Sequence, residues 1–261
     1  MEAQIAEKIQ PSKSSKPGRN TVVEMRHVSK SFGDNHVLND LNLDLFEKEN
    51  LVILGRSGTG KSVLIKILVG LLKPDEGEVK VLGFDVPSLN RNDLNELRKQ
   101  IGFSFQLSAL YDSMTVRENL EFPIKRNLGI YDKGKLDEMV KRALEDVGLL
   151  KAIDQRPVEL SGGMRKRVGI ARTLILQPKI MLYDEPTSGL DPITSVEINQ
   201  LIMEVREKYH TSSIIITHDI SCARQTSDRI IALFDGKNKL EGTFEELKKS
   251  DAPEIKPFFN Y

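Results

Sequence analysis

The sequence predicts an α/β fold with a mainly parallel core sheet, and three patterns carry this prediction. Residues 51–54 form a short continuous apolar run, which is typical of a parallel strand buried on both faces. A glycine-rich turn and a second apolar stretch of helical length, residues 63–68, follow directly. Two more apolar runs, residues 180–183 and 214–216, are separated by a predicted amphipathic helix, whose stripe is Ile198, Leu201, Ile202, Val205 and Tyr209. Strands that alternate with helices indicate a parallel sheet.

Strands with alternating polarity are expected on both sides of the glycine-rich turn. Residues 21–54 read as strands, and a half-buried antiparallel strand is indicated by the alternation of Leu41, Leu43 and Leu45 with polar residues. After the turn, a second alternation leads to Gln106 at a strand end; its apolar members are Ile101, Phe103 and Phe105. The sequence therefore adds an antiparallel β region to the parallel core.

Residues 107–160 change in character and predict a largely helical insertion. Charged residues dominate there, and residues 135–147 carry apolar side chains at helical spacing. Near the C-terminus, two strands are expected at residues 230–234 and 239–240, joined by a turn at 235–238. Thr243 and Glu246 then form a capping box for a short helix.

Composition and charge restrict the class of protein. The 261 residues suffice for a full core, and 38 basic against 38 acidic residues give a formal net charge of zero. Proteins that bind nucleic acid by bulk electrostatics normally have a basic excess, so no nucleic-acid partner is expected. The single cysteine, Cys222, excludes an internal disulfide, fits a reducing compartment and is expected to be a buried apolar side chain. No apolar run approaches the roughly 18 residues that span a bilayer, which predicts a soluble cytoplasmic protein.

The turn after residues 51–54 fills the phosphate-binding pattern G-x-x-x-x-G-K-[ST] with Gly55, Arg56, Ser57, Gly58, Thr59, Gly60, Lys61 and Ser62. A strand, a glycine-rich turn and a helix N-terminus in this order form an anion site, because backbone N–H groups converge and the helix dipole favours negative charge. We expect Lys61 to reach the β- and γ-phosphates of a nucleoside triphosphate, and the Ser62 hydroxyl to ligate magnesium. A turn that fits the pattern by chance is the alternative.

Two carboxylates follow the apolar run at residues 180–183. Asp184, at the carboxyl end of a parallel strand beside the phosphate loop, is placed to hold magnesium through its water shell. Glu185 can accept a proton from an attacking water. Without the phosphate loop, both residues would read as solvated acids at a strand end.

A second helix start with anion-binding character begins at Ser161. Ser161 is a favourable N-cap, and Gly162 and Gly163 leave the backbone N–H groups bare. Two such starts in one nucleotide-binding chain suggest that each serves a different nucleotide. An ordinary capped helix is the alternative for this segment alone.

Taken together, these motifs resemble the ATP-binding subunits of ABC transporters over residues 21–247. Residues 160–164 are similar to the signature motif of that family, and Asp184 with Glu185 to the end of its Walker B motif. Gln106 stands where the family has its Q-loop glutamine, and residues 188–191 are similar to its D-loop. His218 occupies the place of the switch histidine, and Phe32 that of an aromatic residue that stacks on adenine.

The resemblance implies a P-loop NTPase ABC ATPase fold, with a mainly parallel core sheet, an antiparallel β subdomain and a helical subdomain insertion at about residues 107–175. It also implies a homodimer in which two copies face each other head to tail. Each ATP, with its Mg²⁺, would lie between the phosphate loop of one copy and Ser161, Gly162 and Gly163 of the other. One chain cannot readily offer both loops to the same nucleotide.

Roles for single residues follow from the same resemblance. Glu185 would be the general base, His218 would hold the γ-phosphate, and Asp191 would couple the two sites across the dimer. Gln106 would contact magnesium, beside Ser62 and Asp184, and report its state to the helical insertion, which docks on a membrane permease. Read alone, His218 is a histidine at a strand end, and Gln106 and Asp191 are surface polar residues.

Three segments are similar to the ABC ATPases of Mla-type phospholipid systems, which work with MCE-type lipid-binding proteins: residues 105–116, 160–168 and 191–195. Met164 replaces the glutamine that usually ends the signature. Because the anion contacts belong to Ser161 and the glycine amides, we expect activity to survive this change. The basic run at residues 165–167 is expected to be a solvated face.

The sequence therefore predicts an ATPase on the inner face of a bacterial cell membrane that powers lipid movement, most simply of phospholipid, through a permease. An ABC ATPase for another solute is the first alternative, and Met164 counts against it. A soluble ABC ATPase acting on DNA or ribosomes is disfavoured, because the chain has neither a sustained heptad run nor an internal repeat. A non-hydrolysing scaffold is disfavoured by the presence of Glu185 and His218.

The two ends of the chain are expected to lie outside the ATPase domain. Residues 1–20 are polar, contain two prolines and read as a flexible arm. Residues 248–261 read as a tail. Its aromatic residues, Phe258, Phe259 and Tyr261, are expected either to be disordered or to dock on a partner ATPase.

Overall fold

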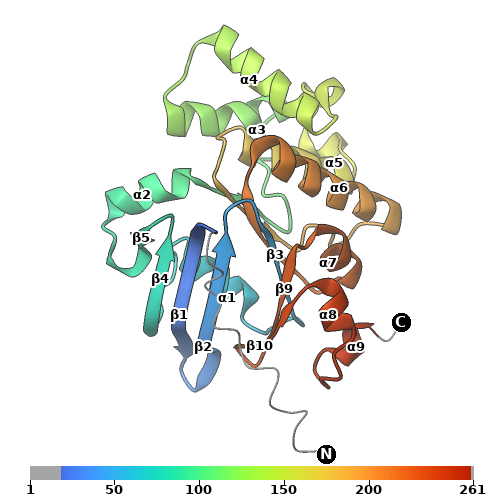
Figure 1. Ribbon diagram of the computed structural model, residues 1–261. Coiled ribbons are helices and arrows are strands. Elements are labelled where there is room, and N and C mark those ends of the chain that lie inside the picture. Colours follow the sequence, from blue (N-terminus) through green and yellow to red (C-terminus); the bar gives the residue numbers. More distant parts are fainter. Residues whose placement is uncertain (1–18, 260–261) are drawn as a thin grey trace, which may run out of the picture.

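The computed structural model describes residues 19–259, which form a core sheet, a smaller antiparallel sheet and a helical part (Figure 1). The core sheet has the strand order β10-β9-β3-β8-β7-β6. Its inner pairs are parallel, and β10 pairs antiparallel with β9 at one edge. The strands are β3 (Asn50–Leu54), β6 (Ile101–Ser104), β7 (Ile180–Asp184), β8 (Ser212–Thr217), β9 (Arg229–Phe234) and β10 (Lys237–Gly242).

Burial on both faces explains the continuous apolar runs of the core strands. Every residue of β3 and β8 is buried, as in a parallel sheet that is covered on both sides. The connecting helices are α1 (Lys61–Leu68), α6 (Pro192–Tyr209) and α7 (Ile220–Thr226). Along β3, Leu51 and Ile53 join the apolar core shared with α1, whereas Val52 and Leu54 join the core shared with α6 and α7. The predicted parallel core sheet is confirmed.

The antiparallel sheet has the order β2-β1-β4-β5 and packs over the α1 face of the core sheet. Its strands are β1 (Thr21–Phe32), β2 (Asn35–Phe46), β4 (Glu76–Val81) and β5 (Phe84–Asp85). Leu41, Leu43 and Leu45 are buried, as their alternation predicts. The sequence did not reveal β4, β5 or α2 (Arg91–Lys99), because each buries too few side chains to produce a long periodic pattern.

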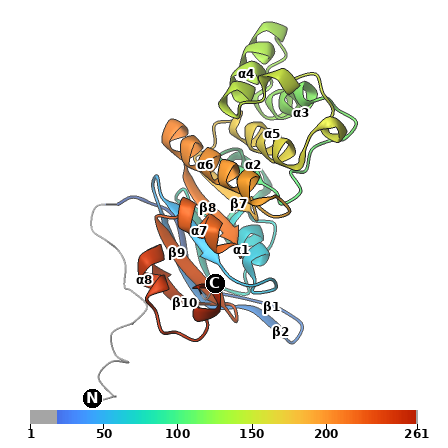
Figure 2. The same ribbon diagram turned by 90° about the vertical axis from the view of Figure 1, so that its right-hand side faces the viewer.

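The helical part lies at one end of the core sheet, away from the hairpin of β1 and β2 (Figure 2). It contains α3 (Val116–Pro123), α4 (Lys133–Asp146) and α5 (Gly162–Leu174). One apolar face of α4, with Leu136, Val140 and Leu144, is buried. These helices confirm the largely helical insertion between the first and later core strands.

The C-terminal segment is ordered up to residue 259, which differs from the expectation of a disordered tail. After α8 (Phe244–Lys248), whose capping box of Thr243 and Glu246 is present, the chain turns back as α9 (Lys256–Phe259). The Phe258 ring lies 5.9 Å from that of Phe234, and the Phe259 ring 5.3 Å from that of Phe244. Up to residue 259, this segment therefore packs on its own chain. Tyr261 and all but the end of the expected arm, residues 1–18, lie outside the described residues.

The link between β9 and β10 is shorter than the sequence predicts. Phe234 pairs with Lys237, so the loop consists of Asp235 and Gly236 alone. Both have left-handed backbones, with φ of 49° and 71°, as a two-residue hairpin turn that matches the strand twist requires. Between residues 19 and 259, no helix is both long enough and apolar enough to cross a bilayer.

Candidate nucleotide site

The phosphate loop connects β3 to α1 and needs glycine at several positions. Gly58 and Gly60 have left-handed backbones, with φ of 86° and 96°. A Cβ atom on Gly60 would lie 2.7 Å from the Val37 carbonyl oxygen, and one on Gly55 would lie 2.7 Å from that of Leu233. Arg56 and Ser57 are exposed, and the Thr59 hydroxyl donates to the Arg56 carbonyl oxygen at 3.0 Å. The loop is therefore a tight turn between the two sheets, with one exposed side.

Lys61 begins α1, and its side chain is buried under the loop. The Lys61 ammonium donates to the carbonyl oxygens of Gly55 at 2.6 Å and Arg56 at 2.9 Å. Its Nζ also lies 3.8 Å from Glu185 Oε1. Burial lowers the pKa of Lys61, and the charges of Glu185 and Asp184 oppose this shift. A cation thus sits where the loop would receive a phosphate.

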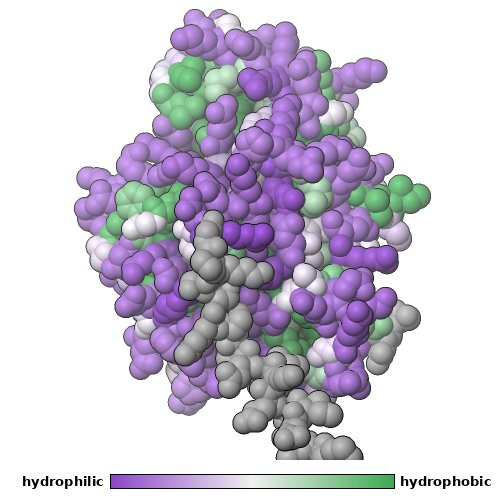
Figure 3. Space-filling view, viewed as in Figure 1, coloured by the Kyte–Doolittle hydropathy of each residue, from purple (hydrophilic) through white to green (hydrophobic). Residues whose placement is uncertain are grey.

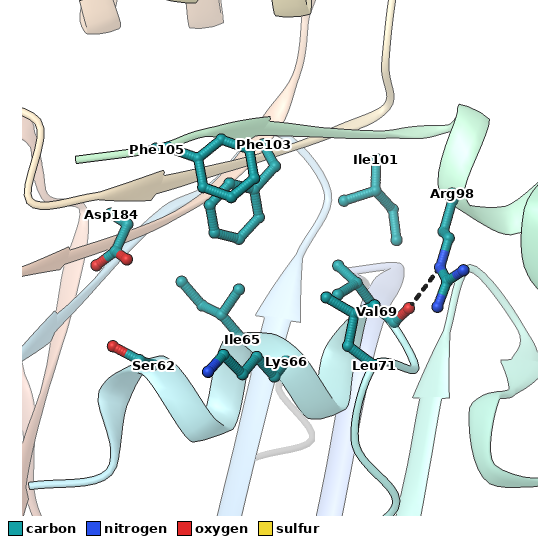
Figure 4. Close-up of a pocket in the computed structure, with 10 residues that line it drawn as sticks. All are labelled: Ser62, Ile65, Lys66, Val69, Leu71, Arg98, Ile101, Phe103, Phe105 and Asp184. Carbon is teal, nitrogen blue, oxygen red and sulfur yellow. Dashed lines mark hydrogen bonds between the residues drawn. The ribbon is translucent and has the colours of Figure 1, made fainter. Parts of the chain in front are cut away.

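Ser62 and Asp184 line one end of a pocket of about 360 Å³ between α1 and β6 (Figure 4). Burial, followed by the charge of Glu185, raises the pKa of Asp184; the ammonium groups of Lys61 and Lys166 oppose it. A hydroxyl and a carboxylate are oxygen ligands of the kind that magnesium prefers. The donor set fits a magnesium ion, and the loop fits a triphosphate.

Glu185 contacts His218 just beyond the ends of β7 and β8. His218 Nδ1 lies 2.9 Å from Glu185 Oε2, and the Thr217 hydroxyl donates to the same oxygen at 3.4 Å. Glu185 has a left-handed backbone, with φ of 48°, which is uncommon for a residue with a Cβ atom and is found at functional sites. Glu185, His218 and Ser188 line a hollow of about 460 Å³.

Gln106, two residues after β6, links this group to the segment at residues 188–191. Its side-chain amide donates to the Ser188 hydroxyl at 3.1 Å. Its carbonyl oxygen accepts a hydrogen bond from the Lys166 ammonium at 2.5 Å, and the Glu185 carbonyl oxygen accepts one from the same ammonium at 3.1 Å. The structure therefore brings Lys61, Asp184, Glu185, His218 and Gln106 into one group.

The expectation that residues 165–167 form a solvated face is wrong for Lys166. Lys166 is only 6% exposed, and the Arg167 guanidinium bonds the Glu197 carboxylate at 2.9 Å; Arg165 is exposed. Lys166 follows the buried Gly163 by three residues and precedes the buried Ile170 by four, which places it on the inner face of α5.

The residues of the signature motif form a second group with the start of α6. The Ser161 hydroxyl caps α5 by accepting from the Met164 N–H at 3.2 Å. A Cβ atom on Gly162 would lie 3.3 Å from Leu190, and one on Gly163 would lie 2.5 Å from Thr194. Asp191 caps α6 by accepting hydrogen bonds from the Thr194 N–H and hydroxyl, at 3.0 and 2.6 Å, and these bonds lower the pKa of Asp191.

Phe32 belongs to neither group. It ends β1, is 49% exposed and has the Lys30 ammonium 5.6 Å from its ring centroid. Sequence reasoning missed the part played by Lys166, Ser188 and Thr217 in positioning the site. For Lys166, its spacing from Gly163 was the signal that could have found it. Cys222, as expected, is buried, and burial raises its pKa to about 12.

Residues 38–188, more than half of the chain, match the ABC transporter family, and the chain therefore belongs to this family. It is 38% identical over 238 residues to the "Probable ribonucleotide transport ATP-binding protein mkl" of Mycobacterium leprae, a match that covers 91% of this chain and 68% of that protein. It is 37% identical to "Protein TRIGALACTOSYLDIACYLGLYCEROL 3, chloroplastic" of Arabidopsis thaliana, covering 91% and 73%.

A methionine import protein and a solved cassette complete the comparison. The chain is 39% identical to "Methionine import ATP-binding protein MetN" of Clostridium tetani, over 83% of this chain and 67% of that protein. The ATP-binding cassette MJ0796, solved as a dimer in a post-hydrolysis state with ADP and Pi, has a TM-score of 0.77 and 34% identity, covering 85% of this chain and 98% of that one. The chain is accordingly an ATP-binding subunit of the ABC transporter family and an ATPase.

Proposed function

We propose that this chain is the ATP-hydrolysing subunit of a bacterial ABC transporter that moves lipid, most simply phospholipid, between membranes through a permease. The observation that carries the hydrolytic part is the position of Glu185. Its carboxylate lies within 3.8 Å of the phosphate-loop lysine Lys61 and 2.9 Å from His218. A general base needs this proximity to both the phosphate site and a positioning group.

Each residue of this group has a proposed task. Lys61 binds the β- and γ-phosphates, and Ser62, Asp184 and Gln106 hold Mg²⁺, which supplies charge stabilisation for the transferred phosphoryl group when bound. Glu185 accepts the proton of the attacking water, and His218 orients Glu185 and contacts the γ-phosphate. Phe32, exposed at the end of β1, stacks on the adenine ring.

The signature group supports a homodimer with shared ATP sites. Ser161 and Gly162 are exposed at the start of α5, where a helix N-terminus attracts an anion. Within one chain, Gly162 lies against Leu190 and Gly163 against Thr194, rather than in the group around Lys61. A second copy, arranged head to tail, brings Ser161 of one chain to the phosphate bound by Lys61 of the other, and Asp191 then lies at the contact.

Exposed apolar side chains near residues 103–111 support a permease partner. Most of the face in Figure 3 is hydrophilic, and its hydrophobic residues lie in separate patches. Leu71 and Phe105 are 63% and 46% exposed and line the pocket of Figure 4, and the neighbouring Leu107 is 89% exposed. Solvent-exposed apolar groups gathered around a pocket are typical of a protein interaction site. This partner would hold the chain on the inner face of the cell membrane.

The lipid cargo rests on the similarity of residues 105–116, 160–168 and 191–195 to Mla-type ATPases, and on the Arabidopsis relative, which is named for a glycolipid. An MCE-type lipid-binding protein would be a further partner. Transport of another solute is the second candidate, because the Clostridium tetani relative is named for methionine import at 39% identity.

The test is an affinity purification of the tagged Glu185→Gln chain from detergent-solubilised native membranes, with proteins and bound lipids identified by mass spectrometry. The Lys61→Ala chain serves as the control for ATP-dependent capture. We expect a multi-span permease, an MCE-type protein and phospholipid. Recovery of a permease with a solute-binding protein of another type would mean that the cargo is another solute. Recovery of ribosomes or DNA-bound proteins without a membrane protein would refute the assignment as a transporter subunit.

A further inference from the structure

The Lys166 ammonium lies inside the protein and joins two loops of the site. Lys166 belongs to α5 and is 6% exposed. Its Nζ donates to the main-chain carbonyl oxygens of Gln106 at 2.5 Å and Glu185 at 3.1 Å. A buried ammonium is unfavourable unless polar groups surround it, so these two carbonyl oxygens are specific partners of the side chain.

The same face of α5 holds the residues that follow Gln106. Gly169 and Arg172 follow Lys166 at intervals of three residues, which places them on one side of the helix. A Cβ atom on Gly169 would lie 3.2 Å from that of Ser108, and the Arg172 guanidinium donates to the carbonyl oxygens of Ala109 at 2.7 Å and Ser108 at 3.3 Å. Ser108 and Ala109 have left-handed backbones, with φ of 60° and 45°, which surrounding contacts must maintain.

A closed set of hydrogen bonds connects this segment to the candidate base. The Gln106 side chain donates to the Ser188 hydroxyl, and the Ser188 N–H donates to the Glu185 carbonyl oxygen at 3.2 Å. That carbonyl oxygen is also the second acceptor of Lys166. Because Glu185 has a left-handed backbone, the direction of its side chain depends on the contacts that hold this peptide in place.

We propose that Lys166 is a positioning residue for ATP hydrolysis, whose ammonium fixes the Gln106 main chain to the Glu185 main chain and thereby keeps the Glu185 carboxylate against His218. Movement of residues 106–109 is then transmitted to the base through the Lys166 ammonium, in addition to the contact of Gln106 with Ser188. The partners of the Lys166 ammonium are main-chain carbonyl oxygens, so the proposal rests on the proposed role of Glu185 as base and not on the cargo.

The test compares three variants of the full chain by steady-state ATP hydrolysis, binding of a fluorescent ATP analogue and thermal unfolding. Lys166→Met removes both hydrogen bonds at similar side-chain length, and Lys166→Arg retains the charge and can donate to two carbonyl oxygens. Lys179→Met is the matched control, because it makes the same replacement at an exposed lysine just before β7.

We expect kcat to fall between about 10- and 100-fold in Lys166→Met, the loss expected when a catalytic group is displaced by about 1 Å. Affinity for the ATP analogue should be unchanged, Lys166→Arg should recover most of kcat, and Lys179→Met should match the parent chain. If Lys166→Met does not fold, Lys166→Gln, whose shorter neutral amide cannot bridge both carbonyl oxygens, must show the same selective loss of kcat.

Two results would overturn the proposal. One is a folded Lys166→Met chain, of any thermal stability, with the kcat of the parent, which would reduce Lys166 to a packing role. The other is a Lys166→Met chain in which kcat is unchanged, while analogue affinity and kcat/KM fall by the same factor. That result would mean that Lys166 acts on nucleotide binding.

Discussion

His218 Nδ1 and Glu185 Oε2 lie 2.9 Å apart, so two side chains that follow neighbouring strands, β8 and β7, form one unit at the end of the core sheet. The Thr217 hydroxyl contacts the same carboxylate oxygen at 3.4 Å. Glu185 is 13% exposed and His218 is 61% exposed. The Glu185 carboxylate is therefore held by groups inside the protein. The His218 ring faces the hollow, from which it can contact the phosphate of a bound nucleotide.

Replacing His218 by alanine should slow hydrolysis much more than it weakens ATP binding. The variant leaves Glu185 without its ring contact, and we expect a fall in kcat of about 10- to 100-fold, the usual range for a misplaced catalytic group. Phosphate release and binding of a fluorescent ATP analogue measure the two effects. His210→Asn is the control, because His210 is exposed and asparagine tolerates its left-handed backbone, with φ of 52°. Equal kcat values for both variants would contradict the role of His218.

Replacing Lys61 by alanine should weaken nucleotide binding itself. A hydrogen bond to a charged group contributes about 1.5–3 kcal/mol, which corresponds to a loss of roughly 10- to 100-fold in affinity. Titration calorimetry with ATP and Mg²⁺ measures this loss, and Lys73→Ala, at an exposed lysine after α1, is the control. Unchanged ATP affinity in Lys61→Ala would refute the phosphate-loop assignment.

ATP affinity should also decrease as the pH rises, and this decrease should begin at a lower pH than the ordinary lysine pKa of 10.5 would give. Burial lowers the pKa of Lys61 from that value, so the free protein loses the positive charge of Lys61 earlier than an exposed lysine would. Because the protonated form binds phosphate, affinity is full at lower pH and decreases as pH rises through the lowered pKa. Titrations with ATP from neutral pH up to pH 10 measure this decrease in the parent chain. The Lys61→Arg variant keeps its charge, so the same titrations should show no such decrease in its affinity.

The order of motifs along the chain made most of this site predictable. Strand β3, the glycine-rich loop and α1 are adjacent in sequence, so one pattern identified Lys61 and Ser62 together. Asp184 and Glu185 could be added because parallel strands end at the same edge of a sheet, whereas His218 was added only through the resemblance to the ABC family. Lys166 was not recognised, since a lysine between two arginines reads as exposed unless the orientation of the helix is known.

The elements that sequence analysis missed are short and mostly exposed. In β4 only Val79 and Val81 are buried, and in α2 only Leu97, so neither contains a full period of a hydrophobic pattern. In the C-terminal segment the residues were noticed, but their contacts could not be predicted. Phe258 and Phe259 were recognised as unusual, but their partners, Phe234 and Phe244, lie in β9 and α8, and no local pattern reveals such a contact.

Replacing Phe258 by alanine should destabilise the fold, because this ring is 8% exposed and packs on Phe234. Truncation of a buried phenylalanine typically lowers the free energy of unfolding by about 3–5 kcal/mol. Chemical denaturation measures the change, and Phe105→Ala, at a ring that is 46% exposed, should have little effect. If both variants unfold at the same denaturant concentration as the parent chain, the packing of α9 on its own chain is contradicted.

The most direct test of the proposed ATPase mechanism is the Glu185→Gln variant, assayed at the same time for hydrolysis, ATP binding and molecular mass in solution. Loss of a general base should reduce turnover by about 100-fold or more, while Lys61 and the phosphate loop retain ATP. Bound ATP that is not hydrolysed should then hold two copies together as a dimer, detected by light scattering with ATP and absent with ADP. Sustained hydrolysis by this variant would remove Glu185 from the role of base, and a monomer at saturating ATP would contradict the shared sites.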